Sequence, residues 1–302
     1  VHDSAEQKVS STRGGRGERI VLRNVRPPAG GFCFVSVRAE GGRNLDARYV
    51  LRVQSEIAAG TSEVEPNEGL AQASPLIEGE ITGHLGPGDI DVFRLDAQGE
   101  QELSLEVESP ARVDVKLEVL GSDGALLTRA DAGKRHQPER VPNWYTSGGA
   151  VFVRLSAAKG EGNRDEPYRL RVVSKPSQSG SEREPNATPS SATALAPGMT
   201  GLGLLFPRGD VDLWLVDLPV AADVAAAAMP VPIVFKGIPG MRLDVRVIGR
   251  KSGKELGRFQ AGADDGERAL PTRPDDCCLV QVREASGKAS TFKDPYTLSV
   301  GR

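Results

Sequence analysis

Two short runs of oxygen-bearing side chains are the residues of this sequence best suited to chemistry. The first run consists of Glu63, Glu65, Asn67 and Glu68, followed by the couple Asp89 and Asp91. Alternate residues of an extended chain point to the same side, so these side chains converge if the Asp couple begins a neighbouring strand. Calcium takes roughly six to eight oxygen ligands, mostly carboxylates and carbonyls, with loose geometry. The first run therefore predicts a calcium site.

The same pattern occurs a second time with one residue changed. Its members are Glu182, Glu184, Asn186, Asp210 and Asp212. Ala187 stands where the first run has Glu68, which removes one possible ligand, so we expect the second site to be weaker or empty. The alternative for both runs is a solvated linker, in which the Asn starts a turn and the Asp couple ends a strand in water, because acidic loop residues usually lie at the surface.

The two runs belong to a longer internal repeat, which sets the domain organisation. Ser-Glu-x-Glu-Pro-Asn at 62–67 returns at 181–186, a shift of 182 − 63 = 119 positions. Gly-Asp-x-Asp at 88–91 returns at 209–212. A third motif, an apolar run followed by a run that begins with Tyr, occurs three times, at 34–37 with 49–53, 152–155 with 168–172 and 279–282 with 296–300. These recurrences divide the chain into repeats 1–57, 58–176 and 177–302.

Apolar and polar residues alternate within the repeats, as they do in half-buried strands. Val151, Val153 and Leu155 fall on one face of such a strand, and Phe152 and Arg154 fall on the other. The chain has 35 Gly and 21 Pro among its 302 residues, a turn-rich composition that suits short strands. A repeat of about 120 residues with some eight strands has the size of an antiparallel β-sandwich. The sequence therefore predicts an all-β fold of tandem antiparallel β-sandwiches.

The first repeat is incomplete in this sequence. Tyr168 lies 168 − 63 = 105 residues after its acidic run, and no such run precedes Tyr49. Residues 1–57 thus match only the C-terminal half of a sandwich, while the other two repeats are complete. Either the native protein begins further upstream, or a strand-donating partner completes this half, because open sheet edges invite aggregation.

The ordered set of motifs resembles the bacterial pre-peptidase C-terminal domain family. Repeat 58–176 carries the whole set, whereas repeat 177–302 departs from it at 220–240, where an Ala- and Pro-rich insertion interrupts the expected strands. The resemblance implies a jelly-roll-like β-sandwich of secreted or cell-envelope bacterial proteins, which is often appended to extracellular peptidases and is not itself the catalyst. By similarity to the calcium-dependent collagen-binding domains of collagenases, it also implies that residues 63–68 supply calcium ligands.

Other patterns of chemistry are missing from the sequence. His2, His84 and His136 are scattered without zinc-ligand spacing, and neither a Gly-x-Ser-x-Gly elbow nor a phosphate-binding glycine loop occurs. We therefore expect no enzyme activity. The 38 Lys and Arg against 41 Asp and Glu give a net charge of −3 without a basic block, which argues against a nucleic-acid partner. No apolar stretch reaches the roughly 20 residues of a membrane span.

The three cysteines are too few for a disulfide framework. Cys33 and Cys278 share the repeat position of the inward-facing Val151, which predicts that they pack in the core. Cys277 is the neighbour of Cys278, and the two could form a vicinal disulfide or bind a soft metal. Adjacent strand residues point to opposite faces, which argues against reactive thiol chemistry here.

Trp144 and Tyr145 are the candidates for a binding surface. They lie between Pro142 and Ser147, which predicts a loop in which a contact role fits. With the resemblance, this favours a non-catalytic region that acts in adhesion, substrate targeting or spacing and is secreted, periplasmic or at the cell surface. Its partner would be a protein or polysaccharide of the matrix or cell surface. The alternative is the C-terminal accessory region of a secreted peptidase whose catalytic domain lies upstream.

Overall fold

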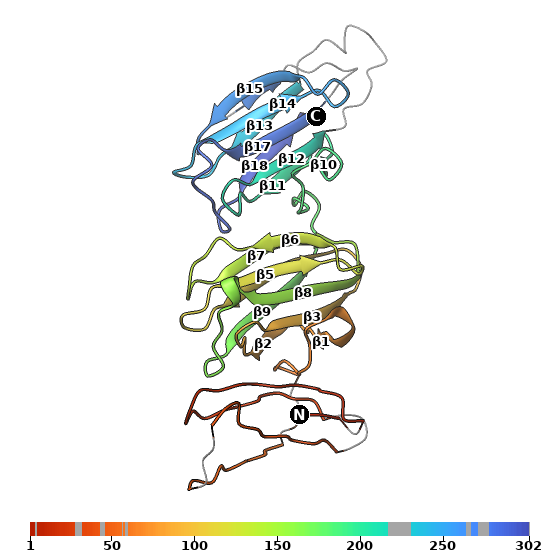
Figure 1. Ribbon diagram of the computed structural model, residues 1–302. Coiled ribbons are helices and arrows are strands. Elements are labelled where there is room, and N and C mark those ends of the chain that lie inside the picture. Colours follow the sequence, from red (N-terminus) through yellow and green to blue (C-terminus); the bar gives the residue numbers. More distant parts are fainter. Residues whose placement is uncertain are drawn as a thin grey trace. The chain divides into compact units, whose positions relative to one another are not determined.

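In the structure, a computed structural model, the regular secondary structure consists almost entirely of β-strands (Figure 1). It describes residues 1–3, 5–27, 32–42, 46–55, 57, 60–216, 231–263, 267–270 and 278–301. The helices of this described part are two single 3-10 turns, η1 (Leu70–Gln72) and η2 (Ala158–Gly160). Neither of them approaches the length or apolar character that a membrane crossing needs.

The first set of strands forms two sheets. Its members are β1 (Ser74–Pro75), β2 (Gly79–Gly83), β3 (Ile90–Ala97), β4 (Gln101–Glu108), β5 (Val115–Leu120), β6 (Leu126–Ala130), β7 (Glu139–Thr146), β8 (Gly149–Ala157) and β9 (Tyr168–Pro176). One sheet has the order β1-β3-β8-β5-β6 and the other has the order β2-β9-β4-β7. Phe93 of β3 meets Tyr168 of β9 edge to face, with 6.5 Å between ring centroids. Side chains from both sheets therefore share one core.

The second set of strands repeats this arrangement strand for strand. Its members are β10 (Thr193–Leu195), β11 (Thr200–Gly203), β12 (Val211–Val216), β13 (Val231–Lys236), β14 (Leu243–Ile248), β15 (Glu255–Ala261), β16 (Glu267–Leu270), β17 (Leu279–Glu284) and β18 (Tyr296–Val300). The sheet orders are β10-β12-β17-β14-β15 and β11-β18-β13-β16. One apolar core takes Trp214 and Val245 from the first sheet and Phe235 and Leu298 from the second. This is a β-sandwich with the same topology as the preceding one.

The predicted all-β fold is confirmed, and the large sheet pairings are antiparallel as expected. The exceptions are β1 with β3 and β10 with β12, which run parallel. In each case a strand of the opposite sheet, β2 or β11, lies between the two partners in the sequence. The connection is thus a crossover and not a hairpin, which permits parallel pairing.

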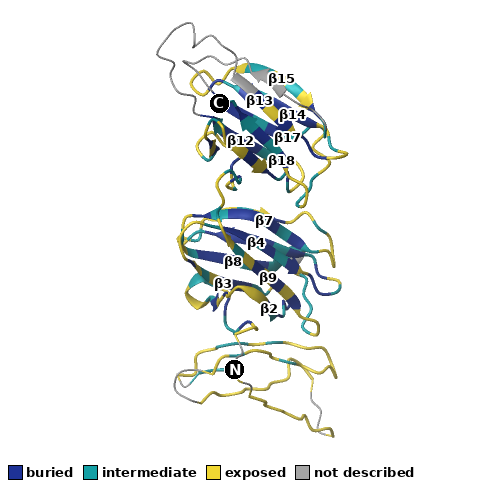
Figure 2. Cartoon of the chain, turned by 180° about the vertical axis from the view of Figure 1, so that it is seen from behind, coloured by how far each residue is buried: buried dark blue, intermediate teal, exposed yellow. Residues whose placement is uncertain are grey.

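Residues up to 57 depart from the sequence-based expectation. Their described part contains isolated β-bridges and no strand, so the strands expected at 34–37 and 49–53 are not formed there. Figure 2 shows this segment as largely exposed. Tyr49 is 75% exposed, whereas its repeat equivalents Tyr168 and Tyr296 are fully buried. The physical reason is that no second sheet among the described residues covers the apolar face of this segment.

Two further expectations concern cysteines and the insertion. Cys278 is buried in the core as expected, but it is disulfide-bonded, which the expected separation of neighbouring side chains did not predict. Cys33 is free and exposed, because the segment around it has no core to enter. Cys277 lies outside the described residues, as does 217–230, which holds much of the expected insertion. The expectation that 220–240 interrupts the strands is wrong for its later part, because 231–236 form β13, which pairs with β16 and β18.

The chain divides into two compact units that do not follow the repeats. The first is Val1–Asp96, Glu106–Glu139 and Ala150–Val172, and the second is Ala97–Leu105, Arg140–Gly149 and Val173–Arg302. Residues 1–57 thus fall with the beginning of the second repeat, and Arg140–Gly149 fall with the third. The repeat boundaries after residues 57 and 176 remain predictions from the sequence.

Candidate metal centre

Two acidic lead segments, residues 62–68 and 181–187, carry the carboxylates of the two runs. Backbone hydrogen bonds attach them to the strands that follow. The Glu63 N–H donates to the carbonyl of Thr82 in β2 at 2.9 Å, and the Val92 N–H of β3 donates to the carbonyl of Asn67 at 2.9 Å. In the second lead segment, the Glu182 N–H donates to the carbonyl of Leu202 in β11 at 3.0 Å. These contacts keep each segment extended, so alternate side chains share a side.

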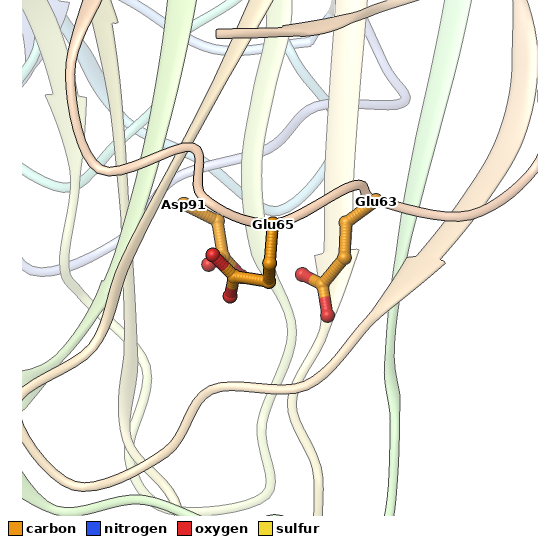
Figure 3. Close-up of side chains that lie close together, drawn as sticks. All are labelled: Glu63, Glu65 and Asp91. Atoms are coloured by element: carbon orange, nitrogen blue, oxygen red, sulfur yellow. The ribbon is translucent and has the colours of Figure 1, made fainter. Parts of the chain in front are cut away.

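Three carboxylates of the first run converge on one point (Figure 3). One oxygen from each of Glu63, Glu65 and Asp91 lies within 4.8 Å of the others. The two Glu side chains descend from the lead segment, and Asp91 belongs to β3. The second run forms the same arrangement from Glu182, Glu184 and Asp212. The structure therefore brings together three of the six ligands predicted for the first run, and three of the five predicted for the second, as a close cluster.

Two of the three carboxylates in each cluster are buried and the third is half-buried, and several polar atoms of the cluster and beside it lack a partner. Glu63 is 2% exposed and Asp91 is 0% exposed. Among the described residues, neither carboxylate oxygen of Asp91 and neither side-chain amide atom of Asn67 has a hydrogen-bond partner. In the second cluster, both side-chain amide atoms of Asn186 and one carboxylate oxygen of Asp212 also lack a hydrogen-bond partner. Because buried polar atoms are normally paired, these atoms point to a ligand in the cluster.

A tyrosine from the last strand of each sandwich contacts the carboxylates. The Tyr168 hydroxyl donates to Glu63 Oε2 at 2.8 Å. The Tyr296 hydroxyl donates to Asp212 Oδ2 at 2.6 Å and accepts the Trp214 Nε1–H at 2.7 Å. Sequence reasoning missed these tyrosines as site residues and used them only as repeat markers. Their recurrence together with each acidic run was the available signal.

Two glycines make room for these tyrosines. A Cβ at Gly83 of β2 would lie 2.1 Å from the Tyr168 hydroxyl oxygen and 2.2 Å from Glu63 Oε2. A Cβ at Gly203 of β11 would lie 2.3 Å from the Tyr296 hydroxyl oxygen. Both tyrosines are fully buried, so their rings cannot move away from an added Cβ. The close approach of strand, tyrosine and carboxylate therefore requires glycine at these positions.

The remaining predicted ligands differ in burial: Asn67 and Asn186 are fully buried, whereas Asp89 and Asp210 are half-buried. Asp89 accepts two backbone N–H groups at 3.0 and 3.2 Å, and Asp210 accepts two at 2.8 and 2.9 Å. Glu68 is exposed. Together with Glu63 and Glu65, Glu68 and Asp89 line a cavity of about 240 Å³.

Burial raises the pKa of the cluster carboxyls. Burial, with the nearby charges of Asp89 and Glu63, raises the pKa of Glu65 from 4.5 to about 8. Burial and the charge of Asp210 raise the pKa of Glu184 to about 8 as well. Burial is also the main cause of the raised pKa of Glu63, Asp91, Glu182 and Asp212. A cation that binds here must displace protons, so its affinity should increase with pH.

In the absence of a cation, the free energy of unfolding is expected to fall as pH rises from about 5 to about 8. The folded-state pKa of about 8 for Glu65 and Glu184 exceeds the ordinary 4.5. The folded chain therefore holds protons that the unfolded chain releases, and this stabilisation, complete below about pH 4.5, is lost as pH passes through 8. Urea denaturation of chelator-treated protein measures the effect. A constant or rising free energy of unfolding over this interval would contradict it.

Trp144 and Tyr145 do not lie in the expected loop. They belong to strand β7, in which buried and half-buried side chains alternate up to Asn143, and Asn143 and Trp144 are both buried. Trp144 is 4% exposed, and the half-buried Tyr145 ring lies under the Arg183 guanidinium, 4.5 Å from its centroid. The loop prediction was wrong because Pro142 is accommodated within this strand. A contact role for the pair remains a prediction.

The donor set of both clusters suits a hard divalent cation. Each cluster consists of Glu and Asp oxygens, with neither His nor Cys among its members in the described residues. Oxygen-only sites favour calcium or magnesium over zinc or copper. The two buried acidic clusters can therefore hold a metal ion.

Comparison with known proteins gives matches among solved structures. No protein-family model matches the chain, and no curated protein matches it in sequence. The pre-peptidase C-terminal domain of a collagenase from Bacillus anthracis matches with 15% identity and a TM-score of 0.30, over 37% of this chain and 100% of that one. A periplasmic inhibitor of g-type lysozyme from Aeromonas hydrophila matches with 13% identity and a TM-score of 0.26, over 33% and 94% of the two chains. The N-terminal CBM22-1-CBM22-2 tandem domain of Xyn10C from Paenibacillus barcinonensis matches with 11% identity and a TM-score of 0.20, over 74% of this chain and 85% of that one.

Proposed function

We propose that this chain is a non-catalytic region of tandem β-sandwiches, of the pre-peptidase C-terminal kind, whose acidic lead segments bind calcium. One observation supports this most strongly. The same buried carboxylate cluster, with polar atoms that lack partners, stands in the lead region of both sandwiches. Carboxylates buried side by side repel one another and lose their hydration, and a divalent cation compensates for both costs.

Calcium is the cation that the donor set favours. Calcium accepts roughly six to eight oxygens in variable geometry, whereas magnesium requires a near-ideal octahedron and keeps several waters. The carboxylates and the Asn67 side chain of the first lead segment, with Asp89 and Asp91, offer more oxygens than a magnesium site of that kind uses. Calcium modules outside cells bind with Kd values of about 10⁻⁴ to 10⁻³ M. Such sites fill outside the cytoplasm, so we place the chain among secreted, periplasmic or cell-surface proteins.

The proposed role is adhesion, substrate targeting or spacing. The proposed partner is a protein or polysaccharide of the matrix or cell surface. For residues 1–57, a strand-donating partner is also proposed, because Phe34, Tyr49 and Leu51 are 49%, 75% and 53% exposed. In the complete sandwiches the equivalent strands are covered by a second sheet.

Calcium is expected to raise the melting temperature of the chelator-treated chain. At 50 times a Kd of about 10⁻⁴ M, binding to the folded state alone stabilises it by about 2 kcal/mol. For a sandwich of this size, that corresponds to roughly 5 to 10 °C. Differential scanning calorimetry with about 5 mM calcium, magnesium or chelator measures the shift. Identical melting curves with calcium and with chelator would remove the proposal.

A further inference from the structure

We infer that each cation site extends into the preceding repeat, where an asparagine acts as a positioning residue for the first glutamate of the site. The pairs are Asn24 with Glu63 and Asn143 with Glu182. The inference rests on the proposed function because it concerns the same two clusters. It adds a consequence, which is that cation binding controls how firmly the end of one repeat is attached to the lead segment of the next.

The side-chain contact occurs at both sites. Asn24 Nδ2–H donates to Glu63 Oε1 at 3.3 Å, and Asn143 Nδ2–H donates to Glu182 Oε1. In both cases the asparagine precedes its glutamate by 39 positions. Asn143 is 4% exposed, so its amide has exchanged water for this carboxylate. The recurrence with identical spacing indicates a feature of the repeat rather than a chance contact.

Backbone hydrogen bonds join the same segments. The Glu65 N–H donates to the Asn24 carbonyl at 2.8 Å, and the Arg26 N–H donates to the Glu65 carbonyl at 2.8 Å. At the second site, the Tyr145 N–H donates to the Glu184 carbonyl at 3.0 Å. Both contacts are parallel bridges of a single residue pair. Each is too short to be stable alone and depends on the side chains around it.

The compact units agree with this attachment. Arg140–Gly149, which includes Asn143, falls in the same unit as Val173–Arg302 although the sequence assigns it to the preceding repeat. The Arg183 guanidinium lies over the Tyr145 ring and also pairs with Glu100 at 3.3 Å.

The first glutamate of each site belongs to the cation cluster and also accepts the asparagine hydrogen bond. Glu63 Oε1 accepts the His84 backbone N–H at 2.7 Å in addition to the Asn24 amide, and Oε2 accepts the Tyr168 hydroxyl. Glu182 Oε1 accepts the backbone N–H of Leu204 at 2.7 Å in the same way. A cation bound to this carboxylate fixes its position, so the asparagine hydrogen bond keeps its geometry. The bridge beside it is then opened less often.

Calcium titration of the full chain with one site removed tests whether each asparagine side chain contributes to the site that remains. Asp212→Asn leaves the first site, in which Asn24→Gly should weaken calcium affinity about tenfold, the worth of a hydrogen bond to a charged group. Glycine keeps the positive φ of 54° at Asn24. Asp91→Asn leaves the second site, in which Asn143→Ala should have the same effect. Gln7→Ala and Gln178→Ala are the matched controls and should leave affinity unchanged.

Amide hydrogen exchange of the same proteins tests the attachment. Calcium should slow exchange of the Arg26 and Tyr145 amides about tenfold in the parent chain, and the asparagine variants should lose this protection. Asn24 is exposed, so its variant will fold even if Asn143→Ala does not. Calcium binding with unchanged affinity in both asparagine variants, or without protection of Arg26 and Tyr145, would overturn the inference. Absence of calcium binding in the parent would instead overturn the proposed function.

Discussion

Asp91→Asn is expected to change the stability of the first sandwich in opposite directions with and without calcium. With about 5 mM calcium the variant should melt roughly 5 to 10 °C below the parent, because the gain of about 2 kcal/mol from binding is lost. With chelator at about pH 8 it should melt above the parent, because a neutral amide replaces a buried carboxyl that is costly to ionise beside Glu63 and Glu65. Scanning calorimetry under both conditions gives the comparison.

Asp96→Asn provides the matched control for this experiment. Asp96 lies on the same strand, but its side chain is 60% exposed and pairs with Arg94 at the surface. Its removal should change stability by about 0.5 kcal/mol or less in either condition. A decrease for Asp91→Asn both with calcium and with chelator would show that Asp91 is an ordinary structural residue and not a cation ligand.

Gly83→Ala is expected to damage both the first sandwich and its cation site. The added Cβ would lie 2.1 Å from the Tyr168 hydroxyl and 2.2 Å from Glu63 Oε2, so strand β2 and the buried ring must separate. Overpacking of this kind costs about 3 kcal/mol. Because Glu63 moves with the ring, the calcium-induced rise in melting temperature should also shrink. Urea denaturation with and without calcium measures both effects.

Gly69→Ala is the matched control for the glycine experiment. A Cβ there has its nearest neighbour at 3.9 Å, and Gly69 has a φ of −131° that any residue adopts. The control should retain parental stability and calcium response. If Gly83→Ala behaved like Gly69→Ala, the packing of Tyr168 against the carboxylates would be wrong.

Much of the fold and part of the site could be predicted from the sequence. Alternation of apolar and polar residues is a local signal, and it identified strands such as β8 and β9. The recurrence of Glu63, Glu65 and Asp91 as Glu182, Glu184 and Asp212 identified the residues that the structure brings within 4.8 Å of one another. Both signals depend on residue type and short spacing alone.

The other site features depend on contacts between distant residues. Tyr168 lies 105 positions from the Glu63 that it contacts, and Asn24 lies 39 positions from it. Neither contact follows from the spacing in the sequence. The Tyr168 contact requires the pairing of β2 with β9, and the Asn24 contact requires the bridge between residues 25 and 65. The exposure of Tyr49 was missed for a related reason, since a strand pattern predicts burial only where a second sheet is present to cover it.

The number of calcium ions bound per chain tests the central claim most directly. Isothermal titration of the chelator-stripped chain at about pH 7.5, where carboxylate ligands give up their protons to the metal, counts them. The two clusters predict two ions per chain, the tighter one in the first sandwich, where Glu68 has no counterpart in the second. The double variant Asp91→Asn with Asp212→Asn should bind none. Absence of calcium binding by the parent chain, or equal binding by the double variant, would contradict the account.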